Sequence, residues 1–197
     1  MEAKSTVALL LAAGESKRLG RPKQLLPYKG RTLLTHTFEE LKVCCDDVLV
    51  LTGAHREAVE AVLPVEANIL WNPNWKQGMG STIAMGVKEL VNRTGVETIL
   101  ISTCDQPGLG RFHFEELLKT AEKNEGAATD YGKRGGVPAV FSRSVWSALE
   151  QLEGDKGARD LINCEQRDIE WVQPVGSVFD IDTEEDFLKL TRNPFQD

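Results

Sequence analysis

The strongest constraint on the fold is a set of continuous apolar runs separated by amphipathic stretches. Four runs have the length and continuity of strands that are buried on both faces. They are Val7–Ala12, Val48–Thr52, Asn68–Trp71 and Thr98–Thr103. Strands that alternate with helices in this way predict parallel β-α units, with helices packed on both faces of one sheet.

Four amphipathic stretches supply the helices, with apolar residues on one helical face within 33–41, 58–63, 83–91 and 114–121. The chain is less regular after a Gly-rich stretch at Gly132–Gly136. The later elements are helices near Ser144–Leu152 and Ala158–Asn163, strands near Ile169–Val172 and Ser177–Ile181, and a closing helix from Thr183 to about Leu190. We therefore expect one domain over residues 1–197, a three-layer α/β/α fold whose mostly parallel, Rossmann-like sheet has mixed later strands.

Charge is distributed unevenly along the chain. Its 197 residues include 23 Lys or Arg and 30 Asp or Glu, and the net charge of −7 argues against a protein that coats nucleic acid. Residues 1–31 nevertheless hold seven Lys or Arg against two Glu, a local sum of +5 that leaves −12 for the rest. An acidic protein therefore carries one basic segment near its start.

The cysteine pattern and the lengths of the apolar runs bear on the compartment. Cys44, Cys45, Cys104 and Cys164 show neither C-x-x-C pairing nor zinc-finger spacing, which favours reduced thiols. The run Val7–Ala13 is short for a signal-peptide core, and no apolar run approaches the ~18 residues needed to span a bilayer. We expect a soluble cytoplasmic protein that contacts no membrane.

The first predicted strand leads into a loop that is rich in glycine and basic residues. Ligands bind at the carboxyl ends of strands in open α/β sheets, so this loop lies where a ligand is expected. Gly14 and Gly20 permit positive φ and close backbone approach. Arg18, Arg21 and Lys23 supply donors suited to phosphate. The spacing fits neither the G-x-G-x-x-G fingerprint nor the P-loop, so the residues alone leave a phosphate site and a solvated basic loop both open.

A carboxylate follows the last strand of the first half. Asp105 comes after Thr98–Thr103 and is expected to project into the same crevice as the first loop. Carboxylate with water and phosphate oxygens is the ligand set that Mg²⁺ prefers. An Asp in this position is also a common helix N-cap, here with Pro107 just beyond it.

A longer pattern resembles a known family. The residues from Leu11 to Lys23, followed by Leu25-Leu-Pro27, resemble the signature loop of nucleotidyltransferases that make nucleoside-diphosphate conjugates. They are most similar to the branch of molybdenum-cofactor cytidylyl- and guanylyltransferases. Further segments agree with that branch over about residues 6–190: Asn72–Trp75, Gly78–Ser81, Asp105–Pro107, Gly136–Pro138, Gly154–Arg159 and Asp180–Asp186.

The resemblance implies catalytic and metal-binding roles. Arg18, Lys23 and Asp105 would be catalytic, and Asp105 and Asp182 would bind Mg²⁺ (or Mn²⁺). Asp182 is favoured over Asp180, which alternates with it along the predicted strand and should point to the other face. The structural alternative for this acidic segment is a capping box for the last helix, formed by Thr183 with Asp186.

Binding residues follow from the same resemblance. Nucleotide contacts are implied for Leu11, Ala12, Ala13, Gly14, Arg18, Lys23, Gly78, Met79 and Ser81. Acceptor contacts are implied for Gly136, Pro138, Asp155 and Arg159, although Asp155 and Arg159 also suit an exposed turn with an ion pair. Trp71 and Trp75 either pack near a strand end or stack on a base.

The implied reaction is attack of an acceptor phosphate oxygen on the α-phosphorus of a nucleoside triphosphate, which expels pyrophosphate. A phosphate nucleophile is already ionised at neutral pH, so no Ser, Cys or His nucleophile is required. Ala13 between Ala12 and Gly14 is typical of the cytidylyl enzymes in this branch, which favours CTP over GTP.

The implied acceptor is the molybdopterin-type molybdenum cofactor, and the product would pass to a molybdoenzyme or its chaperone. Val137 stands where relatives often carry His, which leaves the exact acceptor open. Three alternatives remain: the same chemistry with GTP, the same chemistry with a sugar or polyol phosphate, and a non-catalytic protein that binds or delivers the cofactor.

Overall fold

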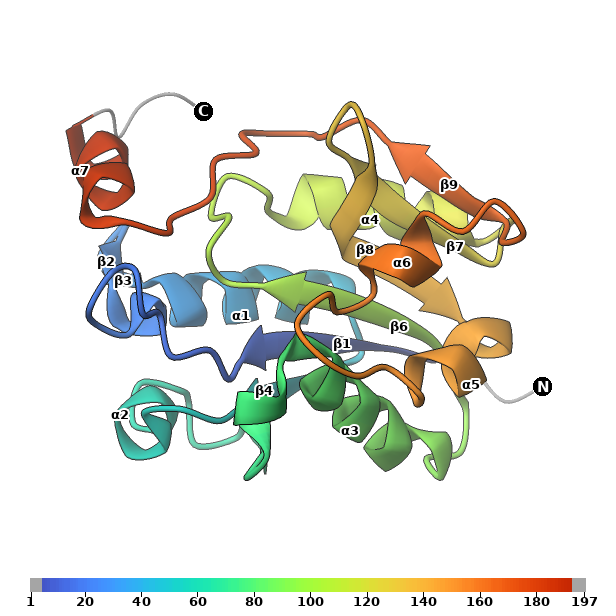
Figure 1. Cartoon of the computed structure of the whole chain (residues 1–197), viewed down its shortest axis with the longest axis horizontal. Helices are drawn as coiled ribbons and strands as arrows, with labels where there is room; N and C mark the ends of the chain where they lie inside the picture. Colours follow the sequence, from blue (N-terminus) through green and yellow to red (C-terminus); the bar gives the residue numbers. More distant parts are fainter. Residues whose placement is uncertain (1–4, 193–197) are drawn as a thin grey trace.

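The computed structural model describes residues 5–192, and a seven-stranded sheet crosses it in the order β5-β4-β1-β6-β8-β7-β9 (Figure 1). The strands are β1 (Ser5–Ala12), β4 (Asp47–Thr52), β5 (Asn68–Trp71), β6 (Val96–Thr103), β7 (Gly126–Asp130), β8 (Gly135–Ser142) and β9 (Ile169–Val172). Neighbouring strands are parallel except that β8 runs antiparallel to both β6 and β7. The expected mostly parallel sheet with a mixed later part is confirmed.

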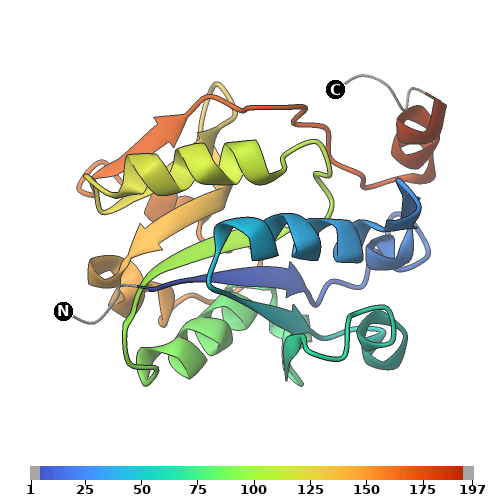
Figure 2. The same ribbon diagram turned by 180° about the vertical axis from the view of Figure 1, so that it is seen from behind.

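Helices cover both faces of the sheet and complete the three layers. The helices α1 (Leu33–Cys44) and α4 (Arg111–Ala121) lie side by side on one face (Figure 2). The opposite face carries α3 (Met79–Val91), α5 (Trp146–Leu149) and α6 (Arg159–Ile162). Successive residues of β1 pack against the helices on opposite faces of the sheet, because side chains alternate in direction along a strand. Leu9 is buried in the core with α3, and Leu10 in the core with α1 and α4.

Parallel strands bring their carboxyl ends to one edge of the sheet. The loop after β1, the segment between β5 and α3, and the loop after β6 therefore gather at this edge, which is where ligands bind in such sheets.

The predicted strand at Ser177–Ile181 is wrong. This segment leaves the sheet after β9 and runs across to α7 (Glu184–Arg192) without pairing in a ladder (Figure 1). One backbone hydrogen bond, from the Ile181 N–H to the Asp105 carbonyl at 2.9 Å, holds it beside the loop after β6. The capping box ahead of α7 is confirmed, because the Asp186 N–H binds Thr183 Oγ1 at 3.2 Å and the Thr183 N–H binds Asp186 Oδ2 at 2.9 Å.

Other elements, early and late in the chain, also differ from the prediction. The strands β7 and β8 and the small hairpin of β2 (Pro27–Tyr28) with β3 (Arg31–Thr32) were not expected. The helix expected at 58–63 is α2 (Arg56–Glu60), and α5 and α6 are shorter than expected.

Within residues 5–192, no helix is both long enough and apolar enough to cross a membrane, and the four cysteines are free thiols. The assignment of all 197 residues to one domain stays a prediction.

Candidate active site

The loop after β1 is held in shape by its own backbone and by two buried leucines. The Ser16 carbonyl accepts hydrogen bonds from the N–H groups of Leu19 and Gly20, both at 3.1 Å. Gly20 has a φ of 75°, a left-handed conformation that favours glycine. Leu19 and Leu26 are buried in a small core with Phe187 of α7. The loop is therefore a fixed platform.

Gly14 does not use the positive φ that glycine permits, since its backbone lies outside the left-handed region. Its carbonyl instead accepts a hydrogen bond from Gln24 Nε2 at 2.9 Å, and the same amide donates to the Ala12 carbonyl at 3.0 Å. The buried Gln24 thus ties the end of β1 to the loop.

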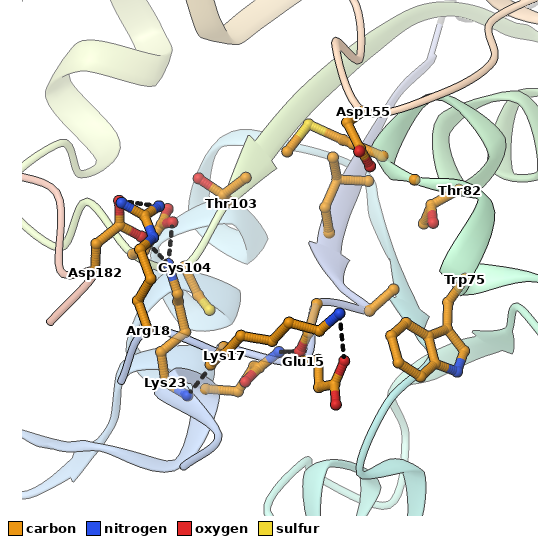
Figure 3. Close-up of a pocket in the computed structure, with 18 of the residues that line it drawn as sticks. Glu15, Lys17, Arg18, Lys23, Trp75, Thr82, Thr103, Cys104, Asp155 and Asp182 are labelled. Carbon is orange, nitrogen blue, oxygen red and sulfur yellow. Dashed lines mark hydrogen bonds and ion pairs between the residues drawn. The ribbon is translucent and has the colours of Figure 1, made fainter. Parts of the chain in front are cut away.

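Lys23 bridges two carboxylates that lie far away in the sequence. Its Nζ donates to Asp105 Oδ2 at 2.9 Å and to Asp182 Oδ1 at 2.7 Å (Figure 3). Burial alone would lower the pKa of Lys23, but the two carboxylates outweigh it and raise the pKa to about 12. The side chain is only 15% exposed, so a permanent positive charge sits at the carboxyl end of β6.

The side chains of the two arginines in this loop, Arg18 and Arg21, bind different carboxylates. Arg18 donates to Asp182 Oδ2 at 2.8 Å. Burial would raise the pKa of Asp182, but Lys23 and Arg18 outweigh it and lower the pKa. Arg21 donates to Glu184 at 2.8 Å and lies 5.2 Å from the ring centroid of Phe187, so it ties the loop to α7.

The start of α3 packs tightly against the segment 154–159. Gly78 has a φ of 101°, and a Cβ there would approach the Gly154 backbone to 2.4 Å. The Gly80 N–H donates to the Gly154 carbonyl at 2.8 Å. This contact brings Asp155 and Met79 together, and both line the two cavities described next.

Two cavities meet at the cluster formed by Lys23, Asp105 and Asp182. The first, of about 730 Å³, lies among the loop after β1, the start of α3 and the end of β6 (Figure 3). The second, of about 780 Å³, lies between that cluster and the segments 131–137 and 155–162. Both are lined by Arg18, Lys23, Met79, Thr103, Asp105, Asp155 and Asp182. Ligands bound in the two cavities would therefore meet at this shared lining, most of which is charged.

Comparison with known proteins supplies the family. The MobA-like NTP transferase domain family matches residues 8–170. The chain belongs to this family. Membership makes it a nucleotidyltransferase, in a family that includes molybdenum-cofactor cytidylyl- and guanylyltransferases.

Individual relatives cover nearly the whole chain. Nicotine blue oxidoreductase from Paenarthrobacter nicotinovorans is 34% identical, over 92% of this chain and 94% of the relative. Molybdenum cofactor cytidylyltransferase from Escherichia coli (strain K12) is 23% identical, over 91% and 92%. The crystal structure of Rv0371c from Mycobacterium tuberculosis H37Rv matches with a TM-score of 0.86 at 28% identity, over 98% and 100%. Its complex with manganese matches with a TM-score of 0.80 at 24% identity, over 95% and 98%.

Most of the expected nucleotide-binding residues lie together. The first cavity is lined by Leu11, Ala13, Gly14, Arg18, Lys23, Gly78 and Met79. Ala12 and Ser81 lie outside that lining. Ala12 is buried in the core, and Ser81 Oγ donates to the Gly78 carbonyl at 2.8 Å at the start of α3. Trp75 lines this cavity at the end opposite Arg18 and Asp182, whereas Trp71 does not line it (Figure 3).

The expected acceptor residues lie mainly around the second cavity. Gly136, Asp155 and Arg159 line it, and Asp155 also lines the first. Pro138 is buried outside the lining, where its carbonyl accepts a hydrogen bond from Thr129 Oγ1 at 2.8 Å.

Sequence reasoning missed several residues of the second cavity. Lys133 and Arg134 line it from the loop between β7 and β8. Gln106 and Tyr131 line it as well and contact each other. The expectation that Asp180 points away from Asp182 is wrong, because the strand on which it rested does not form and both residues line the second cavity; Asp180 does not line the first. The position of Gln106 directly after Asp105 was the available signal.

A buried histidine supports the segments behind the second cavity. His113 Nδ1 accepts a hydrogen bond from the Val175 N–H at 3.3 Å, and Nε2 lies 2.8 Å from Thr129 Oγ1. Because Thr129 donates its own proton to the Pro138 carbonyl, it accepts one from His113 Nε2. The imidazole is therefore neutral, and burial lowers its pKa to about 4.

We expect acid to destabilise the protein through His113. In the unfolded state the His113 imidazole becomes protonated below about pH 6.5, whereas in the folded state it stays neutral down to about pH 4. The free energy of unfolding should therefore fall by up to about 3 kcal/mol between these pH values. Urea unfolding at several pH values measures the slope, and a His113→Gln variant should show a slope smaller by about one proton. Equal slopes in both proteins would contradict the assignment.

Proposed function

We propose that this nucleotidyltransferase transfers CMP from CTP to the terminal phosphate of a molybdopterin-type cofactor and releases pyrophosphate. The meeting of two cavities at Lys23, Asp105 and Asp182 carries this proposal. A triphosphate in the first cavity and an acceptor phosphate in the second would meet there, which supplies the positioning that phosphoryl transfer needs.

Lys23 and Arg18 are suited to the triphosphate. Each of these residues lines both cavities and donates to a carboxylate oxygen. Their donors therefore point into the junction, which is the place where the two cavities meet at Lys23, Asp105 and Asp182. Arginine can grip phosphate through two N–H groups, and lysine acts as a compact charge. Together they would stabilise the negative charge that builds on the leaving pyrophosphate.

Asp105 and Asp182 are suited to a divalent cation. Their carboxylates are close enough to share one ammonium group, at 2.9 and 2.7 Å. Within residues 5–192, no three His, Cys, Asp or Glu side chains cluster as a metal site. Two carboxylates completed by phosphate oxygens and water match the usual Mg²⁺ arrangement, and the manganese complex of Rv0371c supports Mn²⁺ as a substitute. When bound, such an ion would neutralise phosphate charge.

The base is proposed to lie near Trp75 and Ala13, which line the first cavity. A Cβ built on Gly53 would lie 2.8 Å from the Ala13 Cβ and 2.6 Å from the Trp75 Cβ, so the three residues pack closely. Because Ala13 lines this cavity, we infer that its methyl group narrows the space for the base, which would favour the smaller pyrimidine of CTP over the purine of GTP.

Removing that methyl group should relax the selectivity. In Ala13→Gly we expect the ratio of kcat/KM for GTP to that for CTP to rise roughly tenfold, in line with the effect of one carbon in a binding pocket. Steady-state pyrophosphate release with each nucleotide measures the ratio. Ala61→Gly, at an exposed alanine outside both cavities, should leave it unchanged. An unaltered ratio in Ala13→Gly would remove Ala13 from base selection.

The second cavity suits a phosphorylated acceptor. Lys133, Arg134 and Arg159 line it, and within residues 5–192 their side chains have no hydrogen-bond or ion-pair partner. These cations would draw an anionic ligand toward the junction. A cytoplasmic location, and a molybdoenzyme or its chaperone as the recipient, are part of the proposal.

One assay tests the reaction. Pyrophosphate release from CTP with Mg²⁺ is measured with isolated molybdopterin cofactor, with sugar or polyol phosphates, and without acceptor. We expect release that requires the cofactor. Preference for GTP would overturn the nucleotide assignment, and release with a sugar phosphate instead would overturn the acceptor. The oxidoreductase reaction in the name of the 34% relative belongs to that protein, and the charged junction favours transfer for this chain.

A further inference from the structure

A buried amide connects two walls of the second cavity. Gln106 is 8% exposed, and its Nε2 donates to Asp180 Oδ1 at 2.5 Å. Its Oε1 accepts a hydrogen bond from the Tyr131 hydroxyl at 3.0 Å. The two partners lie 74 and 25 residues away in the sequence, so the amide joins the segment before α7 to the end of β7.

The connection extends to β8. The Tyr131 hydroxyl also lies 2.7 Å from the Val137 carbonyl. Burial raises the pKa of Tyr131 to about 12, so the phenol stays protonated and can donate. The phenol has one proton, which Gln106 Oε1 and the Val137 carbonyl share, so the bridge runs from Asp180 through Gln106 to Tyr131, which also contacts Val137.

The bridge belongs to one cavity only. Asp180, Gln106, Tyr131 and Val137 all line the second cavity, and none of the four lines the first. Asp105, next to Gln106, lines both. The amide thus stands beside the junction but holds only the acceptor side.

We propose that Gln106 is a positioning residue for the acceptor, an inference that rests on the proposed function. It fixes the separation between Asp180 and the β8 wall, where Gly136 and Val137 line the cavity. It also orients the Asp180 carboxylate, which can only accept hydrogen bonds when ionised. The acceptor class is accordingly a phosphate ester that also carries N–H or O–H donors for Asp180.

The chemistry of the bridge explains why an amide stands here. The Asp180 carboxylate needs a donor, and the amide oxygen gives the Tyr131 phenol a second acceptor beside the Val137 carbonyl, so a glutamine side chain serves both partners. Leucine at this position has a similar size but serves neither. Gln106→Leu should therefore remove the hydrogen bonds to Asp180 and Tyr131 while filling a similar volume.

Kinetics of four variants test the inference. In Gln106→Leu we expect the KM for the molybdopterin cofactor to rise about tenfold or more, as for loss of a hydrogen bond to a charged group. The KM for CTP should not change, and Gln151→Leu, an exposed glutamine outside both cavities, should change neither. Tyr131→Phe should act in the same direction but less strongly. Adding it to Gln106→Leu should have little further effect, because both changes break one bridge.

A second measurement needs no acceptor. Hydrogen exchange of the backbone amides at 180–182 should be faster in Gln106→Leu than in the wild-type protein, because the segment loses a side-chain anchor. An unchanged acceptor KM, an equal rise in both KM values, or unchanged exchange would overturn the positioning role. A wild-type protein that transfers nothing to the cofactor would instead refute the proposed function.

Discussion

Replacing Lys23 with alanine should lower turnover at least ~100-fold while the protein stays folded. The Lys23 ammonium is 15% exposed, bridges Asp105 and Asp182, and lines both cavities. No other side chain in the described part of the chain bridges these two carboxylates. Loss of one preorganised charge contact costs about 3–4 kcal/mol in comparable sites. Pyrophosphate release under single-turnover conditions, with a thermal melt of the same sample, measures both effects.

The Lys23 variant has a matched control and a distinctive signature. Lys123→Ala, at an exposed lysine after α4, should retain full turnover. Lys23→Ala should weaken CTP binding yet still bind Mn²⁺, because both carboxylates remain. Near-normal turnover in Lys23→Ala would exclude this side chain from the mechanism.

The first half of the fold could be predicted because its signals are local. Leu9 and Leu10 lie in a continuous apolar run that only a doubly covered strand can bury, and the helices on either side carry clear apolar faces. The later half depends on tertiary contacts. Gly126 begins β7 where a Cβ would lie 2.4 Å from the Val140 carbonyl, so a glycine that propensity counts against a strand is required by the packing.

The segment before α7 shows the limit of periodicity. Apolar and polar residues alternate from Phe179 to Asp182, which is the pattern of a half-buried strand. The structure instead holds this segment through the side chains of Asp180 and Asp182 and one Ile181 backbone bond, and none of these contacts leaves a trace in the local alternation.

Some residues of the candidate site could be predicted from the sequence, and others could not. The sequence pattern could single out Lys23, Asp105 and Asp182 because a fixed family motif carries each of them, and the structure brings the three together. Their catalytic and metal-binding roles stay predictions. The contacts of Gln106 with Tyr131 and Asp180 could not be foreseen, because each joins residues of different elements and depends on the register of the folded chain.

Asp105→Ala should lower turnover by ~10²–10³ through a different route from Lys23→Ala. Asp105 follows β6 and faces both cavities, and its removal leaves Asp182 as the single carboxylate of the pair. Lys23 keeps its 2.7 Å contact with Asp182, so the triphosphate site should persist and the KM for CTP should change little. The dependence on Mg²⁺ should move to higher concentrations, because one carboxylate binds the ion more weakly than two.

Titration with Mn²⁺ in the absence of nucleotide separates the two variants. We expect Asp105→Ala to lose Mn²⁺ binding and Lys23→Ala to keep it. Asp46→Ala, whose Oδ2 accepts a hydrogen bond from the Thr6 N–H far from either cavity, serves as the carboxylate control. If Asp105→Ala bound Mn²⁺ as tightly as the wild-type protein, the ion would have to lie elsewhere, and Asp105 would be left with the role of orienting Lys23.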